Sequence, residues 1–485
     1  MNAGVRWEPW WPMAIPNKAT YTFDYDRFAK GIKSTVFINA PAGLYYPGDP
    51  GYPGLSGMHS QPWNFQPRLG LAWDPTGRGR TSIRAAYGLS YEYVNGAFFQ
   101  NGTIAPPWGS EVRQFSPIGG LDNPFQDFPG GNIFPVTFDK NAKYSAYGGF
   151  LTHNYDTKTT QVHNWNLSVQ RQLNSNWLVS ASYIGNESAH LWTTKALNPA
   201  LFLGTAPCAI QGVSYPTCTT SSNINQRRIF SLSGNPDAVY LGAVDIVDDG
   251  ATQNSNGLQL SSQSRFGRGV NINANYTWSH CIGIPTSGGG LPNLGTNYVD
   301  INNRDFERGN CSSDRRHIFN LTAVAETPQF ANPTLRTVGS GWRLSTIWRV
   351  QSGSYLTIGT GTDRLLDGTS AGSQRPNQVL QNPYGDKSLS NYLNPKAFAQ
   401  PALGTVGNMG RANILGPGSW SLDMALARTF RIAESDRLEV RAEAFNVPNS
   451  VRLGNPNTNL NSNQFGQITS GPDRRIMQFA LKYIF

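Results

Sequence analysis

The chain has 485 residues, of which 14% are charged, 39% hydrophobic and 12% aromatic, and its formal net charge is +9. It contains no run of about 18 apolar residues, which excludes a transmembrane helix; a mean hydropathy of -0.40 does not exclude strands of about 10 residues that cross a membrane. Its lysines and arginines are scattered singly rather than gathered into a basic patch, so nucleic acid is not an expected partner.

Alternation of apolar and polar residues predicts about twelve β-strands in chain order. The expected ranges are 1–9, 65–74, 80–93, 159–173, 176–191, 255–266, 269–281, 315–327, 338–352, 417–431, 435–447 and 473–485. The clearest strand places Val270, Ile272, Ala274, Tyr276 and Trp278 on one face and only small polar residues on the other. Such a strand fits between lipid and a watery lumen.

Short and long connections alternate along the chain. Short turns are expected at 74–79, 174–176, 267–269, 328–338 and 433–436, and long loops at 10–64, 94–158, 192–254, 282–314, 352–416 and 448–472. This alternation is typical of outer-membrane barrels with short periplasmic turns and long extracellular loops. The sequence therefore predicts an all-β, transmembrane antiparallel β-barrel. An even strand number with the last strand running inward places the carboxy terminus in the periplasm.

The last strand supports the same fold. Phe479, Leu481, Tyr483 and Phe485 lie on one face, so the chain ends on a strand with a whole face of large apolar groups. Soluble proteins seldom end in this way, whereas an outer-membrane barrel needs a lipid-facing closing strand.

Charged residues on the strands are expected to face the lumen. Glu439, Arg441 and Glu443 share one face of a strand and cannot all point into lipid. With Arg84 and Glu92 they could contact a plug or a solute, or they could form an interior ion-pair lattice that holds the barrel round. We favour the lattice.

Four cysteines form two local pairs in predicted extracellular regions, Cys208 with Cys218 and Cys281 with Cys311. Three connectivities are possible, and local disulfides are the simplest. A thiolate metal site is the alternative, but CxxC spacing is absent. We expect disulfides.

Other polar clusters give no site with metal or catalytic spacing. His317 is expected to hydrogen-bond at the barrel rim. Acidic residues at 245, 248 and 249, and at 363 and 367, could attract Ca²⁺, but solvated loops are favoured. No GxSxG, HExxH or P-loop motif occurs, so we expect no enzyme, no catalytic, cofactor-binding or metal-binding residue, and no cofactor.

Aromatic residues are frequent in the 94–158 loop. They are Trp108, Phe115, Phe125, Phe128, Phe134, Tyr144 and Tyr147. They could build a ligand surface, or the loop could pack on itself over the barrel mouth. We favour self-packing.

Several sequence blocks occur in a familiar order. They are 4–9 (GVRWEP), 47–51 (PGDPG), 67–70 (PRLG), 73–75 (WDP), 87–88 (YG), 276–279 (YTWS), 314–317 (DRRH), 416–418 (GPG), 441–446 (RAEAFN) and 465–468 (FGQI). Together with the final strand they resemble the carboxy-terminal part of TonB-dependent outer-membrane receptors of the Oar-like type.

The resemblance implies that residues 1–485 are the carboxy-terminal part of a receptor barrel, about twelve of 22 strands. Such receptors carry a plug in the lumen and import nutrients with energy from TonB. No signal peptide, TonB box or plug is recognisable, so we expect an incomplete transporter whose TonB contact belongs to a missing amino-terminal region. Expected partners are outer-membrane lipid and an imported ligand of unknown class. The alternative is a structural or adhesive outer-membrane protein that binds partners through its long loops.

Overall fold

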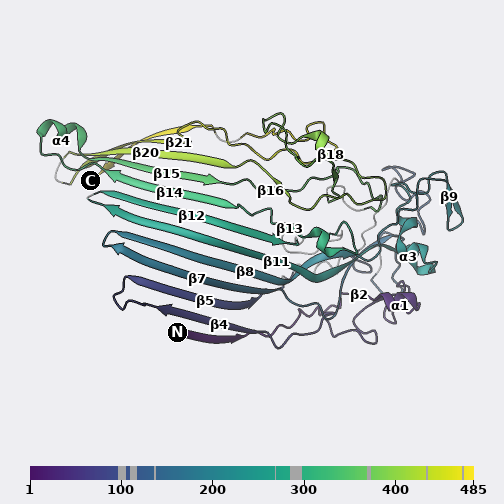
Figure 1. The fold of residues 1–485 in the computed structure, drawn as a ribbon. Coiled ribbons are helices and arrows are strands. Elements are labelled where there is room, and N and C mark those ends of the chain that lie inside the picture. The colour runs from purple at the N-terminus through teal and green to yellow at the C-terminus, as the bar shows by residue number, and fades with distance from the viewer. Residues whose placement is uncertain are drawn as a thin grey trace.

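One large sheet is the principal element of the structure (Figure 1). A computed structural model describes residues 1–94, 96, 105–109, 117–135, 138–267, 269–284, 298–368, 373–432, 435–471 and 474–485. Twelve strands follow one another in the order β1-β4-β5-β7-β8-β11-β12-β14-β15-β20-β21-β22, and all neighbours in that order are antiparallel. Two short strands join the sheet from outside this order, β13 on β12 and β6, which is parallel, on β11.

All twelve predicted strands are present. Their bounds are β1 Asn2–Trp7, β4 Phe65–Trp73, β5 Thr81–Tyr91, β7 Gln161–Asn174, β8 Trp177–Ala196, β11 Leu241–Phe266, β12 Val270–Gly283, β14 His317–Glu326, β15 Trp342–Gln351, β20 Ser419–Arg431, β21 Arg437–Phe445 and β22 Ile476–Ile484. The predicted antiparallel fold of an outer-membrane β-barrel protein is thereby confirmed. In the described part of the chain, β1 and β22 end the strand order and no pairing joins them.

The strand register separates the two faces of the sheet, because directly paired residues point to the same side. One row across eight strands is polar: Ser82, Gln170, Ser180, Ser261, Asn275, Asn320, Arg349 and Ser421. The adjacent row is apolar: Trp73, Ile83, Val169, Ala181, Leu260, Tyr276, Phe319, Val350 and Trp420. The polar face is the lumen side and the apolar face is the outward side.

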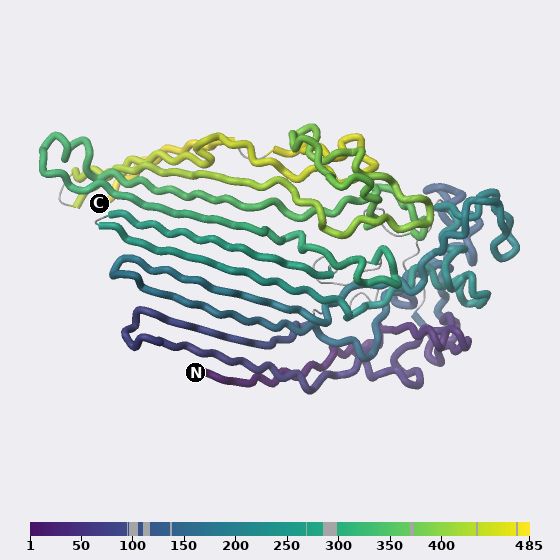
Figure 2. The backbone as a smooth tube through the Cα atoms, viewed as in Figure 1, coloured from purple at the N-terminus to yellow at the C-terminus, as the bar shows by residue number. Residues whose placement is uncertain are grey.

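Short connections lie at one end of the sheet and long loops gather at the other, as the backbone trace shows (Figure 2). Two expectations need correction. The connection at 328–338 holds helix α4 (Pro333–Gly339), because the Asn332 side chain accepts hydrogen bonds from the N–H groups of Thr334 and Leu335 and Pro333 starts the helix. The expected 192–254 loop is shorter, since β8 and β11 extend into it and remain paired as far as Asp245 and Ala196.

The long connections fold into a layer of their own, here called the loop layer (10–64, the described parts of 94–158, 197–240, 298–314, 352–416 and 448–471). It holds α1 Tyr25–Ala29, α3 Ile229–Leu232, β2 Thr22–Phe23, β3 Leu44–Tyr45, β6 Gly148–His153, β9 Cys208–Ile210, β10 Val213–Tyr215, β13 Gly309–Asn310, β16 Tyr355–Leu356, β17 Asn377–Gln378, β18 Phe398–Ala399 and β19 Ile414–Leu415. It also holds the 3-10 helices η2 Asn225–Arg227, η3 Pro236–Tyr240, η5 Arg304–Glu307 and η6 Pro395–Ala397.

Buried apolar clusters lie in the loop layer and in the outer extensions of β8 and β11. The largest includes Tyr21, Phe23, Phe28, Phe150 and Phe230. A barrel wall has lipid on one side and lumen on the other, so it cannot supply such a core itself. No helix in the described ranges is long and apolar enough to cross a membrane.

Candidate functional site: the lumen face and the loop layer

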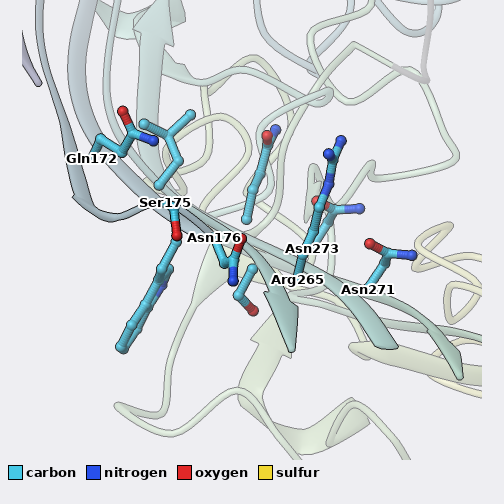
Figure 3. Close-up of a pocket in the computed structure, with 10 residues that line it drawn as sticks. Gln172, Ser175, Asn176, Arg265, Asn271 and Asn273 are labelled. Atoms are coloured by element: carbon cyan, nitrogen blue, oxygen red, sulfur yellow. The ribbon is translucent and has the colours of Figure 1, made fainter. Parts of the chain in front are cut away.

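The lumen face carries a polar cavity near the short turns (Figure 3). Its volume is about 740 Å³, and its lining includes Arg265 from β11, Asn271 and Asn273 from β12, and Asn176 from the β7–β8 turn. The register places Arg265 and Asn271 side by side and Asn273 one step away on the same face. The Arg265 backbone N–H donates to the Asn176 carbonyl at 2.8 Å, which fixes the turn against the neighbouring strand. Amide and guanidinium groups thus face the lumen, where they can hydrogen-bond a solute or another protein segment.

An ion-pair lattice covers the lumen face farther along the sheet. Glu439 accepts from Arg441 at 2.7 Å and from Arg343 of β15 at 3.4 Å, and Arg441 reaches Glu443 at 3.3 Å. The lattice predicted for Glu439, Arg441 and Glu443 is therefore present and ties β15 to β21. Arg343 was not predicted to be part of the lattice, because β15 carries no acidic residue that would indicate an ion pair on its lumen face.

Two of the predicted lattice residues stay outside it. The Arg84 Nε donates to Ser82 Oγ at 3.2 Å, and Glu92 lies exposed just beyond the end of β5. Within the described residues neither forms an ion pair. Glu92 therefore belongs to the rim, where water solvates its carboxylate.

The aromatic residues of the 94–158 loop pack on the loop layer, as the self-packing interpretation predicts. Trp108 contacts the rings of Phe37 and Tyr46, and the Tyr144 hydroxyl lies 2.9 Å from that of Tyr46. Burial raises the pKa of Tyr46 well above its ordinary value. Phe125, Phe128, Phe134 and Tyr147 form a second chain of ring contacts. Phe115 lies outside the described residues.

Buried arginines join separate segments of the loop layer. The Arg227 guanidinium, fully buried, donates to the carbonyls of Thr220, Leu201 and Leu366, so it connects 197–240 with 352–416. Arg375 donates to Glu307, 68 positions away in the chain, at 2.8 and 3.2 Å. Because the partners are far apart in the chain, no local sequence pattern indicates these contacts, and neither arginine was predicted to make them.

A second polar cavity of about 220 Å³ lies where the loop layer meets the lumen face. Gln253 and Gly283 of the β11–β12 pair form its floor, and Ser312, Ser313 and Arg411 are among its other lining residues. Burial lowers the pKa of Arg411, which the nearby Glu307 carboxylate opposes. The cavity offers a cation and hydroxyl groups to a solute that reaches the outer end of the lumen.

Both predicted disulfides are formed. Cys208 pairs with Cys218 and Cys281 with Cys311, with Cα–Cα distances of 5.2 and 5.4 Å. Cys281 lies on the lumen face of β12, since it pairs with Ser255 in the polar register. The second disulfide therefore fixes the 298–311 segment to the inner side of the sheet.

The histidines have structural partners. The His317 Nδ1 lies 2.7 Å from the Tyr276 hydroxyl, which confirms its predicted hydrogen bond at the rim. The others contact Asp156 (His59), Gly57 (His153), Tyr87 (His163), Asp249 (His190) and Asn310 (His280).

Of the acidic residues considered for Ca²⁺, those at 245, 248 and 249 differ from expectation, whereas those at 363 and 367 lie in a loop as expected. Asp245, Asp248 and Asp249 are on strand β11 rather than in a solvated loop, and Asp248 is paired with Arg304 at 2.7 Å. Asp363 accepts hydrogen bonds from the Leu366 and Gly368 N–H groups and from Gln374, and Asp367 lies in the same segment. In the described ranges no three His, Cys, Asp or Glu side chains gather as a metal site.

A sheet with an exposed apolar face, a polar face and long loops at one end defines an outer-membrane β-barrel protein. The chain belongs to the family described as outer membrane beta barrel domain, whose model matches residues 1–478. The family is found in the outer membranes of Gram-negative bacteria. Comparison with curated proteins gives no match.

Solved structures similar to the chain include three outer-membrane proteins. The outer membrane transporter YddB from Escherichia coli aligns with a TM-score of 0.44 at 12% identity, covering 87% of this chain and 41% of that chain. The ferripyoverdine receptor of Pseudomonas aeruginosa gives 0.38 at 11%, covering 88% and 34%. The siderophore receptor PiuA from Acinetobacter baumannii gives 0.39 at 8%, covering 87% and 36%. The chain thus spans 34 to 41% of the length of these structures.

Proposed function

We propose that residues 1–485 belong to the β-barrel domain of an Oar-like, TonB-energised importer of the outer membrane. The observation that carries this proposal is the polar lumen face with two polar cavities, one near the short turns and one beneath the loop layer. A solute that entered from the loop side would meet hydrogen-bonding groups along its whole route. The mechanism is binding and gated passage, without covalent chemistry.

The proposal also sets the orientation and the partners. The short turns and the carboxy terminus lie in the periplasm, and the loop layer lies outside the cell. Contact with the TonB complex is assigned to a segment amino-terminal of this barrel wall, and nucleic acid is no partner. Two of the similar structures are a ferripyoverdine receptor and a siderophore receptor. For this chain, metal chelates, peptides and glycans are the candidate ligands.

The test follows solutes without assuming their class. Wild-type cells and cells lacking the protein are grown in a complex medium, with and without a protonophore, and depletion of medium components is measured by mass spectrometry. The proposal expects at least one solute to be depleted only by energised wild-type cells. Equal depletion by both strains would overturn it and favour the alternative, a structural or adhesive surface protein bound to partners through its disulfide-pinned loops.

A matched pair of variants links uptake to the lumen. Asn273 lines the turn-side cavity, while the next residue, Ala274, points outward in the register. Asn273→Trp is expected to slow depletion several-fold, and Ala274→Trp, which adds the same ring on the lipid side, is expected to leave it unchanged. Equal uptake by both variants would show that the solute does not pass through this part of the lumen.

A further inference from the structure

An arginine lies on the outward, apolar face of the sheet. Arg428 of β20 pairs with Trp342 of β15 and with Val440 of β21, and Val440 pairs with Leu481 of β22. The other three residues of this row are apolar and outward-facing, so Arg428 points the same way. A cation on the lipid side is costly near the middle of a bilayer and is tolerated only near an interface.

The Arg428 side chain is held in one position. One Nη atom donates to the Thr337 carbonyl in α4, at the end of the sheet that carries the short turns. The guanidinium carbon lies 5.2 Å from the ring centroid of Trp342 and 4.6 Å from that of Phe430, which is cation–π distance. Tryptophan and other aromatic rings gather at the depth of lipid headgroups. These contacts fix the charge at headgroup depth.

Among the residues that the structure describes, this charge has no anionic partner. Within the described ranges no carboxylate forms an ion pair with Arg428, and its Nε is enclosed without an acceptor. Asp436, on the next turn, instead accepts from the hydroxyls of Tyr483 and Ser435. A guanidinium in an apolar setting needs an anion, and phosphate is a geometrically suitable one.

A hollow beside Arg428 has the character of an acyl-chain site. Its volume is about 570 Å³, and Arg428 lines it together with Leu426, Ala442, Phe479 and Leu481. The small Ala442 lies between Leu426 and Phe479 in one row of the register, so the surface is recessed between two large side chains. The hollow runs from the Arg428 row away from the turns, which is the direction that an acyl chain takes from its headgroup.

We propose that this groove binds one glycerophospholipid of the leaflet at the turn end, with its phosphate on Arg428 and an acyl chain over Ala442. Charge complementarity identifies the headgroup and the apolar walls identify the chain. The site is on the lipid side of the wall, so it is separate from the lumen and from the importer function.

The experiment is native mass spectrometry of the full chain, folded in detergent micelles, with added phosphatidylglycerol. Arg428→Gln is expected to retain about tenfold less lipid than the wild type. Arg171→Gln is the matched control, because Arg171 of β7 also points outward near the turns, in a row with Val179, but lies outside the hollow. Equal losses in the two variants would overturn the proposal.

Further variants and lipids distinguish a specific binding site from a general attraction between anionic lipid and the protein's positive charge. Ala442→Phe fills the hollow and keeps the cation, so it is also expected to lose the lipid; this variant tests the site if Arg428→Gln fails to fold. Diacylglycerol, which lacks the phosphate, is expected to be retained at least tenfold less than phosphatidylglycerol. Equal retention of diacylglycerol, or preferential retention of lipid A, would contradict the assignment.

Discussion

Arg375 and Glu307 form an ion pair inside the loop layer, where each side chain is only 2% exposed and the closest nitrogen–oxygen distance is 2.8 Å. The Arg375 guanidinium also donates to the carbonyls of Met409 and Phe306 and lies 4.2 Å from the Phe306 ring centroid. Two segments of the loop layer, 298–314 and 352–416, are therefore joined by one enclosed charge pair. A buried pair of this kind is costly to break from one side only.

Arg375→Met is expected to destabilise the loop layer by about 3–5 kcal/mol, because Glu307 would stay buried without its counter-charge. The double variant Arg375→Met/Glu307→Leu is expected to recover most of this free energy. Pulse proteolysis in urea, read at sites within 352–416, measures both values. The exposed Lys396 supplies the control, Lys396→Gln, which should change nothing. A double variant as unstable as the single one would disprove the account.

Trp165 of β7 covers Gly185 of β8 on the outward face. A Cβ at position 185 would lie 2.1 Å from Cε2 of the indole ring, so the ring must move. Gly185→Ala is expected to cost about 1–3 kcal/mol of unfolding free energy, as overpacking does. Urea unfolding in micelles, followed by tryptophan fluorescence, gives the value.

Two variants test the cause of that cost. Trp165→Ala in the Gly185→Ala background should remove most of the additional penalty, since no ring remains to be displaced. Gly88→Ala is the strand control, because its nearest neighbouring atom would be the Arg68 Cγ at 4.0 Å. If Gly88→Ala were as destabilising as Gly185→Ala, the ring contact would not be the reason.

His153 gives the loop layer a pH dependence. Burial lowers the pKa of His153 from 6.5 to about 4, and its Nε2 lies 3.2 Å from the Gly57 carbonyl. The unfolded chain therefore takes up a proton near pH 6.5, before the folded chain does. Stability from this residue is complete above pH 6.5 and falls by about 1.4 kcal/mol per pH unit as the pH drops towards 4, about 3 kcal/mol in all.

The comparison of wild type with His153→Gln isolates this dependence from other acid effects. The variant should lose less stability than the wild type between pH 7 and pH 4.5, measured by urea unfolding at each pH. His59→Gln, at an exposed histidine, should keep the wild-type slope. Identical slopes for the wild type and His153→Gln would exclude His153 as the titrating group.

The two disulfides should differ in their contribution to stability. Each restricts the unfolded chain and is expected to add about 3 kcal/mol, but Cys281–Cys311 spans 30 positions and Cys208–Cys218 only 10. Replacing Cys281 and Cys311 with serine should therefore cost about 1 kcal/mol more unfolding free energy than replacing Cys208 and Cys218. Chemical denaturation of the two double variants tests the order, and a reversed order would contradict the chain-entropy account.

The strands and the disulfides were predictable from sequence because their signals are local. The alternation of Val270, Ile272 and Ala274 with polar residues lies within a single strand. Because successive side chains of a strand point to opposite sides, this alternation also predicts which residues share a face of the sheet. The pairing of Cys281 with Cys311 could be predicted from the assumption that cysteines close in sequence form a disulfide. The Asn332–Pro333 signal for α4 was also present in the sequence, but the turn interpretation overlooked it.

The loop layer could not be predicted, because its contacts join distant positions. Arg227 meets the Leu366 carbonyl 139 positions away, and nothing near either residue indicates the other. The same holds for the Arg375–Glu307 pair. The smaller cavity depends in turn on where these segments lie, because Ser312, Ser313 and Arg411 are among its lining residues. The turn-side cavity depends instead on strand register, which the sequence does not give.

Strand β11 is 26 residues long, about 85 Å at 3.3 Å per residue, whereas a bilayer's hydrocarbon core is about 30 Å thick. Its register with β8 shifts between Asp248 and Gln253, and such bulges bend a strand. The part before this bend carries β6 and its buried neighbours. The strand therefore extends well beyond the thickness of a hydrocarbon core, and its direction after the bend determines how far β6 and its neighbours lie from the barrel wall.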